Sequence, residues 1–124
     1  MSGGTETVLV VDDEAPIRLL CRLNLELEGY RVVEAATLAD ARAILDGGDD
    51  DIAVVLLDVH VGADDGRDFL RELRAEEPAL PVAMFTGSAD IDTIKALGAD
   101  SIIPKPFEPA KLVETVRRLV AAAR

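Results

Sequence analysis

Short apolar runs alternate with amphipathic segments along the chain. Runs rich in valine, isoleucine and leucine begin near Val8, Tyr30, Ile52, Pro81 and Ser101, and a segment with helical periodicity follows each of them. The runs "VLVV" and "IAVVLL" are apolar at consecutive positions, which is typical of parallel strands covered by helices on both faces. The pattern therefore predicts five βα units and an α/β fold.

Two prolines and a glycine mark the first and last helices. Pro16 suits the opening turn of the first helix, Gly29 closes it, and Pro109 opens the last helix, which we expect to continue to the C-terminus. Apolar residues at helical spacing predict the inward faces of both helices. They are Ile17, Leu20, Leu23 (or Asn24) and Leu27 in the first helix, and Leu112, Val116, Leu119 and Val120 in the last.

The sequence signals for the starts and ends of the three middle helices differ from one helix to the next. Thr37 to Asp40 resembles a capping box, which predicts the start of the second helix. The third helix is expected over residues 66–75, before Pro78. The fourth is expected over residues 91–97, which makes it unusually short.

Composition narrows the class of protein. The 124 residues suit one domain, and 24 acidic against 13 basic side chains give a net charge of −11. This charge repels phosphate backbones and anionic lipid heads, so we expect neither direct nucleic-acid binding nor membrane insertion. The single cysteine, Cys21, cannot form an internal disulfide, and the N-terminal residues do not resemble a signal peptide. A cytoplasmic location is therefore expected, with Cys21 as a small helix residue and not a reactive thiol.

Polar side chains follow the ends of four predicted strands. Asp12 and Asp13 follow the first strand and Asp58 ends the third, while Thr86 ends the fourth and Lys105 follows the fifth. Ligands of open parallel sheets bind beyond the C-terminal ends of the strands. One acid at a strand end is more often a turn residue, but these five groups together favour a functional site.

The acids at this edge need a cation. Two carboxylates about 4 Å apart repel by roughly 4 kcal/mol at an effective dielectric of about 20. Hard oxygen ligands with open coordination positions suit Mg²⁺, which in turn suits phosphoryl chemistry. Asp58 could act as a nucleophile toward a phosphoryl group, Thr86 could donate a hydrogen bond to it, and Lys105 could balance its charge.

The segments "VLVVDDE", "VVLLDVHVGADDG", "MFTGS" and "PKPF" resemble, in this order, the signatures of the response-regulator receiver domain. The resemblance covers essentially the whole chain, so residues 1–124 are expected to form a single, stand-alone receiver similar to the chemotaxis regulators. It implies a flavodoxin-like, doubly wound, five-stranded parallel sheet of order 2-1-3-4-5 with five helices. It also implies a two-component signalling phosphoacceptor that catalyses only its own phosphorylation and dephosphorylation, with a sensor histidine kinase or a histidine phosphotransfer protein as the donor.

By position, the resemblance makes Asp58 the phosphoacceptor and Thr86 and Lys105 the pair that contacts the phosphoryl group. The bond between Lys105 and Pro106 corresponds to the family's cis peptide. The implied Mg²⁺ ligands are Asp13 and Asp58 directly, Asp12 through a water molecule, and the backbone carbonyl of His60.

Several positions depart from the family pattern. Gly62 stands where proline is common, and Ile102 stands where the switch residue is usually Tyr, Phe or His. Because the family usually signals through the fourth helix and fifth strand, Ile102 and the short fourth helix are expected to alter switching. A protein target bound in trans, or a second copy of the chain, is expected at the face of the fourth helix, fifth strand and fifth helix. Pro104 is expected on an edge strand.

Two polar residues occupy positions where family side chains modulate dephosphorylation. His60 lies two residues after Asp58, and Ser88 lies two residues after Thr86. We hypothesise that they set the lifetime of phosphorylated Asp58. For His60, an exposed imidazole that supplies only its main-chain oxygen is the simpler alternative.

Three other functions share parts of this pattern. A phosphatase of the haloacid-dehalogenase type needs Asp-x-Asp, whereas the chain has Asp58-Val59-His60. A flavodoxin-like cofactor binder needs a first loop that cradles phosphate, which Asp12 and Asp13 would repel. A degenerate receiver that acts as a phosphorylation-independent interaction module is the main alternative.

Overall fold

The computed structural model describes residues 6–48, 51–87 and 91–123. Its larger sheet consists of β1 (Thr7–Val11), β2 (Arg31–Ala35), β3 (Ile52–Asp58), β6 (Val82–Thr86) and β7 (Ser101–Pro104). All neighbouring strands are parallel, and their order is β2-β1-β3-β6-β7. Since β6 and β7 are the fourth and fifth strands of this sheet, the predicted order 2-1-3-4-5 and the α/β fold are confirmed.

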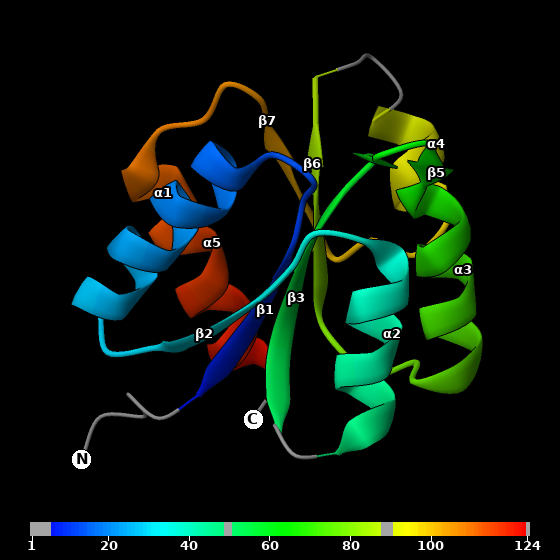
Figure 1. Ribbon diagram of the computed structural model, residues 1–124, viewed down its shortest axis with the longest axis horizontal. Coiled ribbons are helices and arrows are strands. Elements are labelled where there is room, and N and C mark those ends of the chain that lie inside the picture. Colours follow the sequence, from blue (N-terminus) through cyan, green and yellow to red (C-terminus); the bar gives the residue numbers. More distant parts are fainter. Residues whose placement is uncertain (1–5, 49–50, 88–90, 124) are drawn as a thin grey trace.

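Helices cover both faces of this sheet. They are α1 (Ala15–Leu27), α2 (Leu38–Gly47), α3 (Gly66–Glu76), α4 (Ile91–Ala96) and α5 (Pro109–Ala122). Figure 1 shows α1 and α5 on one face, and α2, α3 and α4 on the other. Among the described residues, no helix is long and apolar enough to cross a membrane.

The central strands are apolar at every position because each of their faces packs against helices. Successive side chains of a strand point to opposite faces. Leu56 and Phe85 lie in the core beneath α1 and α5, whereas their neighbours Leu57 and Met84 lie in the core beneath α2, α3 and α4. The sheet therefore separates two apolar layers, and the consecutive hydrophobic residues of the sequence follow from this arrangement.

The inward face predicted for α1 is wrong at its C-terminal end. Leu23 is 53% exposed and Leu27 is 83% exposed, whereas Cys21 and Leu25 are completely buried. The buried series starts at Ile17, which packs against the same core, and continues at intervals of four residues. Because α1 carries leucines around much of its circumference, two series have helical spacing, and only packing against α5 and the sheet selects one of them.

Cys21 lies in the interior of this layer. Desolvation by burial raises the pKa of its thiol to about 12, with a smaller contribution from Asp12. The thiolate, which is the reactive form, is therefore disfavoured in the folded protein. The expectation that Cys21 is a packing residue agrees with this environment.

Other helix predictions agree with the structure. The Thr37 side chain accepts a hydrogen bond of 3.0 Å from the backbone N–H of Asp40 and caps α2. The fourth helix is short, as expected, and has six residues. All four predicted inward residues of α5 are buried: Leu112, Val116, Leu119 and Val120.

A small hairpin that the sequence pattern does not predict follows β3. It pairs β4 (His60–Val61) with β5 (Asp64–Asp65) in an antiparallel ladder. Gly62 lies in its turn with φ of 63°, a conformation that favours glycine. Asp65 then caps α3 by accepting a hydrogen bond of 2.9 Å from the backbone N–H of Arg67. The hairpin thus returns the chain to the end of β3, where α3 begins.

Candidate functional site

The predicted polar residues meet at the C-terminal edge of the sheet. Asp12 follows β1, Asp58 is the last residue of β3, and Lys105 follows β7. The Nζ atom of Lys105 lies 2.8 Å from Oδ2 of Asp12 and 2.8 Å from Oδ2 of Asp58. Both aspartates are buried, Asp12 completely. Three segments that are far apart in the sequence therefore form one charged cluster.

A third carboxylate, Glu14, joins this cluster. Lys105 Nζ lies 3.4 Å from Oε1 of Glu14, and single carboxylate oxygens of Asp12, Glu14 and Asp58 lie within 4.8 Å of one another. Both Glu14 and Asp13 are exposed, and Asp13, predicted as a direct metal ligand, does not belong to this group. The backbone N–H of Glu14 donates a hydrogen bond of 2.9 Å to Oδ1 of Asp12, and the chain bends at Asp13 between them.

Lys105 and the two aspartates stabilise each other's charged forms. Burial raises the pKa of Asp12 above the ordinary value of 3.8, although hydrogen bonds from Lys105 and from the backbone N–H of Glu14 oppose this effect. Burial alone would lower the pKa of Lys105, but its hydrogen bonds to Asp12 and Asp58 outweigh burial and raise it. Lys105 is therefore firmly protonated and balances part of the negative charge of the acids.

The donor set fits a hard divalent cation. Three carboxylates from the end of β3 and the loop after β1 supply only oxygen atoms, and no cysteine or histidine nitrogen belongs to this group. Oxygen-only coordination suits Mg²⁺. The predicted Mg²⁺ cofactor thus agrees with the chemistry of the residues that the structure brings together.

Thr86 and His60 adjoin residues of this cluster. Thr86 is buried at the end of β6, next to β3, and its carbonyl accepts a hydrogen bond of 2.8 Å from the backbone N–H of Lys105. The exposed His60 donates from its backbone N–H to Oδ1 of Asp58 over 3.2 Å. The peptide bond between Lys105 and Pro106 is cis, as expected. Ser88 lies outside the described residues.

The expected switch position, Ile102, lies on the edge strand β7. Ile102 is half-buried on β7 and packs against the core layer that contains Ile94 of α4. On the other face, Phe85 stacks on Phe107 with ring centroids 5.1 Å apart. Pro104 ends β7, which is an edge strand, so the absence of its backbone N–H costs no sheet hydrogen bond on the open side.

Gly66 is a site residue that the sequence analysis did not identify. Its backbone N–H donates to the carbonyl of Val59 over 2.6 Å. A Cβ atom at Gly66 would lie only 2.0 Å from the carbonyl oxygen of Asp58. The first turn of α3 therefore packs directly on the backbone of Asp58, and only glycine permits this approach. The signal in the sequence is a glycine at the start of a helix, which is a weak one.

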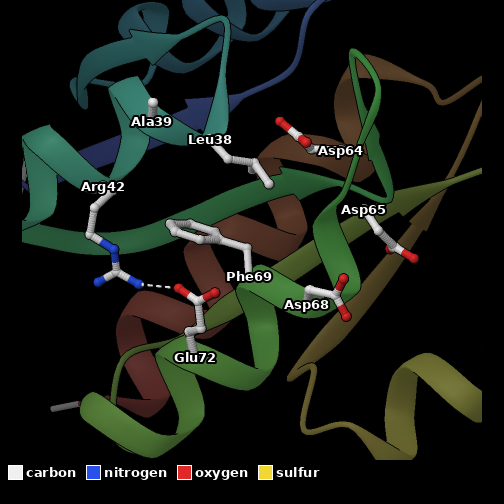
Figure 2. Close-up of a pocket in the computed structure, with 8 residues that line it drawn as sticks. All are labelled: Leu38, Ala39, Arg42, Asp64, Asp65, Asp68, Phe69 and Glu72. Atoms are coloured by element: carbon white, nitrogen blue, oxygen red, sulfur yellow. Dashed lines mark hydrogen bonds and ion pairs between the residues drawn. The ribbon is translucent and has the colours of Figure 1, made fainter.

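A separate pocket of about 340 Å³ lies between α2 and α3. Figure 2 shows the guanidinium group of Arg42 directed at Glu72, near the ring of Phe69. Arg42 also contacts Glu76, and its Cζ lies 5.1 Å from the centroid of the Phe69 ring. Within this pocket Arg42 pairs with Glu72, whereas Asp65 and Asp68 pair with Arg67 and Arg71 beside it. We interpret the contact between Arg42 and Glu72 as a link between α2 and α3. Its lining residues are Leu38, Ala39, Arg42, Asp64, Asp65, Asp68, Phe69 and Glu72.

Comparison with known proteins gives a family match. A family model for the response regulator receiver domain matches residues 8–117, which include the charged cluster. The phosphate regulon transcriptional regulatory protein PhoB of Pseudomonas aeruginosa is 35% identical over 120 residues, which cover 93% of this chain and 52% of PhoB. The response regulator SaeR of Staphylococcus aureus is 33% identical over 116 residues, which cover 91% of this chain and 50% of SaeR. The chain spans about half the length of these curated relatives.

Solved structures support the same assignment. The receiver domain of NtrX from Brucella abortus matches with a TM-score of 0.85 and 31% identity, over 92% of this chain and 98% of that one. A CheY-like receiver domain protein from Methanospirillum hungatei JF-1 matches with a TM-score of 0.87 and 27% identity, over 96% of each chain. Both the fold and the sequence match are those of receiver domains. The chain therefore belongs to the response regulator receiver domain family of two-component signalling.

Proposed function

We propose that residues 1–124 act as one receiver that accepts a phosphoryl group on Asp58 in a Mg²⁺-dependent reaction. The observation that carries this proposal is the position of Lys105 Nζ, 2.8 Å from a carboxylate oxygen of Asp58 and 2.8 Å from one of Asp12. The positive charge of Lys105 thus lies within hydrogen-bond distance of both the nucleophilic carboxylate and an acidic cation ligand.

Transfer begins when a carboxylate oxygen of Asp58 attacks the phosphorus of a phosphohistidine. The new P–O bond forms as the P–N bond breaks, and the electron pair stays on the imidazole, which takes up a proton. Mg²⁺, when bound, would neutralise charge on the phosphoryl oxygens. Thr86 donates a hydrogen bond to the phosphoryl group, and Lys105 pairs with one of its oxygens. Water later attacks the phosphorus, the P–O bond to Asp58 breaks, and inorganic phosphate leaves.

Asp12, Glu14 and Asp58 would hold the cation in this proposal, since their oxygens lie close together. The family resemblance implies a second arrangement, in which Asp13 and the backbone carbonyl of His60 are ligands and Asp12 acts through a water molecule. In the first arrangement, Asp12 and Glu14 would instead bind the cation directly. Both arrangements use carboxylates from the same short loop, and both need Asp58.

The phosphoryl group would be read by another protein. It adds about −1.5 to −2 charges at neutral pH, which we propose reset the loop after Thr86 and the face of α4, β7 and α5. At this face Ile102, an aliphatic side chain packed against the core layer that contains Ile94, takes the place of an aromatic switch residue. Proposed partners are a sensor histidine kinase or histidine phosphotransfer protein in the cytoplasm, and a protein target in trans or a second copy of the chain. The net charge of −11 disfavours direct contact with nucleic acid.

The proposal is tested by intact-mass analysis after incubation with a small phosphodonor such as phosphoramidate. We expect one phosphoryl adduct in Mg²⁺, none in EDTA, and none in Asp58→Asn. Asp46→Asn, which removes an exposed acid of α2, is the matched control and should keep the adduct. An adduct that persists in Asp58→Asn would contradict the proposal, and a wild-type chain without any adduct would favour the degenerate receiver.

We further propose that His60 modulates the lifetime of the phosphorylated state. Its backbone N–H already contacts Asp58, and its exposed side chain lies two residues beyond the acceptor. The decay of the adduct after removal of the donor is expected to change in His60→Ala, and in Ser88→Ala if that residue shares the role. Unchanged decay in both variants would leave His60 with its main-chain contacts only.

A further inference from the structure

The carbonyl group of Asp12 has an unusual partner for a residue at the end of a strand. The backbone N–H of Asp12 still pairs with β2, donating to Ala35 over 3.1 Å. Its carbonyl oxygen instead accepts a hydrogen bond of 2.7 Å from Nη1 of Arg18. Arg18 lies at the beginning of α1, and its side chain is only 17% exposed. A side chain of α1 thus satisfies the first carbonyl beyond β1.

A second contact holds Arg18 in this position. Its Nε donates to Oε1 of Glu34 over 3.0 Å, and the other carboxylate oxygen of Glu34 accepts from Arg22, one turn further along α1. Glu34 lies on β2, directly beside Val10 of β1. Because Glu34 balances the charge of Arg18, the guanidinium group acts on the loop as an oriented donor.

The peptide group held by Arg18 joins Asp12 to Asp13, at the start of the loop that carries two acids of the cluster. Oδ1 of Asp12 accepts a hydrogen bond of 2.9 Å from the backbone N–H of Glu14, and carboxylate oxygens of both residues lie close to Asp58. Rotation of the peptide after Asp12 would change the directions of the Asp12 and Glu14 side chains together. The orientation of two of the three acids therefore depends on this carbonyl.

We propose that Arg18 is a positioning residue for the cation site, and that Glu34 keeps Arg18 in place. The inference rests on the proposed function, since it names the residue that prepares the acids for Mg²⁺. Removal of Arg18 should change the affinity for Mg²⁺ in opposite directions, depending on whether Arg18 acts through its charge or through its position. Removal of a nearby positive charge alone would tighten binding of a divalent cation. Loss of a group that orients the ligands weakens binding, typically by a factor of about 10 or more.

Calorimetric titration of the full chain with Mg²⁺ alone, at low salt, distinguishes these effects. We expect the dissociation constant to rise about tenfold in Arg18→Met. Arg22→Met is the matched control, because Arg22 shares Glu34 but makes no contact with Asp12, and it should bind Mg²⁺ like the wild type. Arg18→Lys keeps the charge but cannot hold two acceptors in the same geometry, so it should also bind more weakly than the wild type.

A metal-free readout accompanies the titration. The amide hydrogen of Glu14, which bonds to Asp12, should exchange faster with solvent in Arg18→Met and at the wild-type rate in Arg22→Met. If Arg18→Met does not fold, Arg18→Lys is used for both measurements. Wild-type affinity in the Arg18 variants, tighter binding, or equal weakening in Arg22→Met would overturn the role of Arg18. A wild-type chain that binds no Mg²⁺ would overturn the proposed function, while exchange at Glu14 would still decide the role of Arg18.

Discussion

Replacement of Gly66 by alanine is expected to destabilise the fold by about 3 kcal/mol and to slow phosphorylation of Asp58 by a factor of about 10 to 100. The added Cβ would lie 2.0 Å from the carbonyl oxygen of Asp58 and 3.2 Å from that of Val59. Both are backbone atoms at the end of the central strand, so no side-chain rotation relieves the overlap. Either β3 or α3 must move, and the carboxylate of Asp58 moves with its backbone.

Gly87→Ala is the control for stability, because a Cβ at Gly87 would meet no atom within 4 Å among the described residues other than its chain neighbours. Urea unfolding followed by circular dichroism gives the free energy of unfolding, and the growth of the phosphoryl adduct in intact-mass spectra gives the rate. We expect Gly87→Ala to retain wild-type stability. If Gly66→Ala were as stable and as fast as the wild type, the close packing of α3 on Asp58 would be refuted.

Lys105→Met is expected to lower the free energy of unfolding by about 3 kcal/mol in the absence of Mg²⁺ and to tighten Mg²⁺ binding. In the wild type the ammonium group hydrogen-bonds Asp12 and Asp58, so its removal leaves buried carboxylates without their balancing charge. A divalent cation should restore that balance. Urea unfolding with and without Mg²⁺ is therefore expected to show a large deficit that Mg²⁺ reduces, and calorimetry should show a smaller dissociation constant.

The deficit of Lys105→Met should also depend on pH. The pKa of Asp12 is raised by burial above 3.8, against an opposing hydrogen bond from Lys105. When the folded pKa of an acid exceeds its unfolded value, the stability present at low pH is lost as the pH rises through the folded pKa. Without Lys105 this pKa rises further, so the deficit should be smallest in acid and grow as the carboxylates ionise. Lys111→Met, which removes an exposed lysine of α5, should show no such dependence.

A deficit that changes neither with pH nor with Mg²⁺ would contradict the assignment of Lys105 as the counter-charge of the cluster. It would indicate lost packing of the lysine stem, whose Nζ also lies 5.7 Å from the centroid of the Phe85 ring. An equal deficit in Lys111→Met would likewise point to a general charge effect of the acidic chain. Comparison of the Lys105 and Lys111 variants therefore distinguishes the loss of a local contact from a change in net charge.

The location of the site at the C-terminal ends of the strands could be predicted from the sequence, because parallel strands that are buried on both faces are apolar at every position. The runs that end at Asp58 and Thr86 therefore have clear C-terminal ends, and the ends of parallel strands share one edge. Lys105 follows the edge strand and reaches Asp12 and Asp58 as expected. The five-stranded order and the cis bond before Pro106 are confirmed as well.

Features that depend on side-chain direction or on close packing could not be predicted in this way. The presence of Glu14 in the acidic cluster depends on the conformation of the loop after β1, and the buried face of α1 depends on which of two apolar series meets the core. The hairpin after β3 has strands of two residues, which are too short for a periodic signal. Gly66 is crowded by the backbone of Asp58, a contact that exists only in the folded chain.

Chemical trapping locates the phosphoryl group directly. Borohydride reduces an aspartyl phosphate to homoserine, and peptide mass mapping then identifies the altered residue. After incubation with a small phosphodonor, we expect the change at Asp58 in Mg²⁺ and at no residue in EDTA. Conversion of another acid such as Asp13, or an unaltered Asp58 in protein that carries the phosphoryl adduct, would contradict the role of the Asp58 carboxylate, which Lys105 contacts together with Asp12.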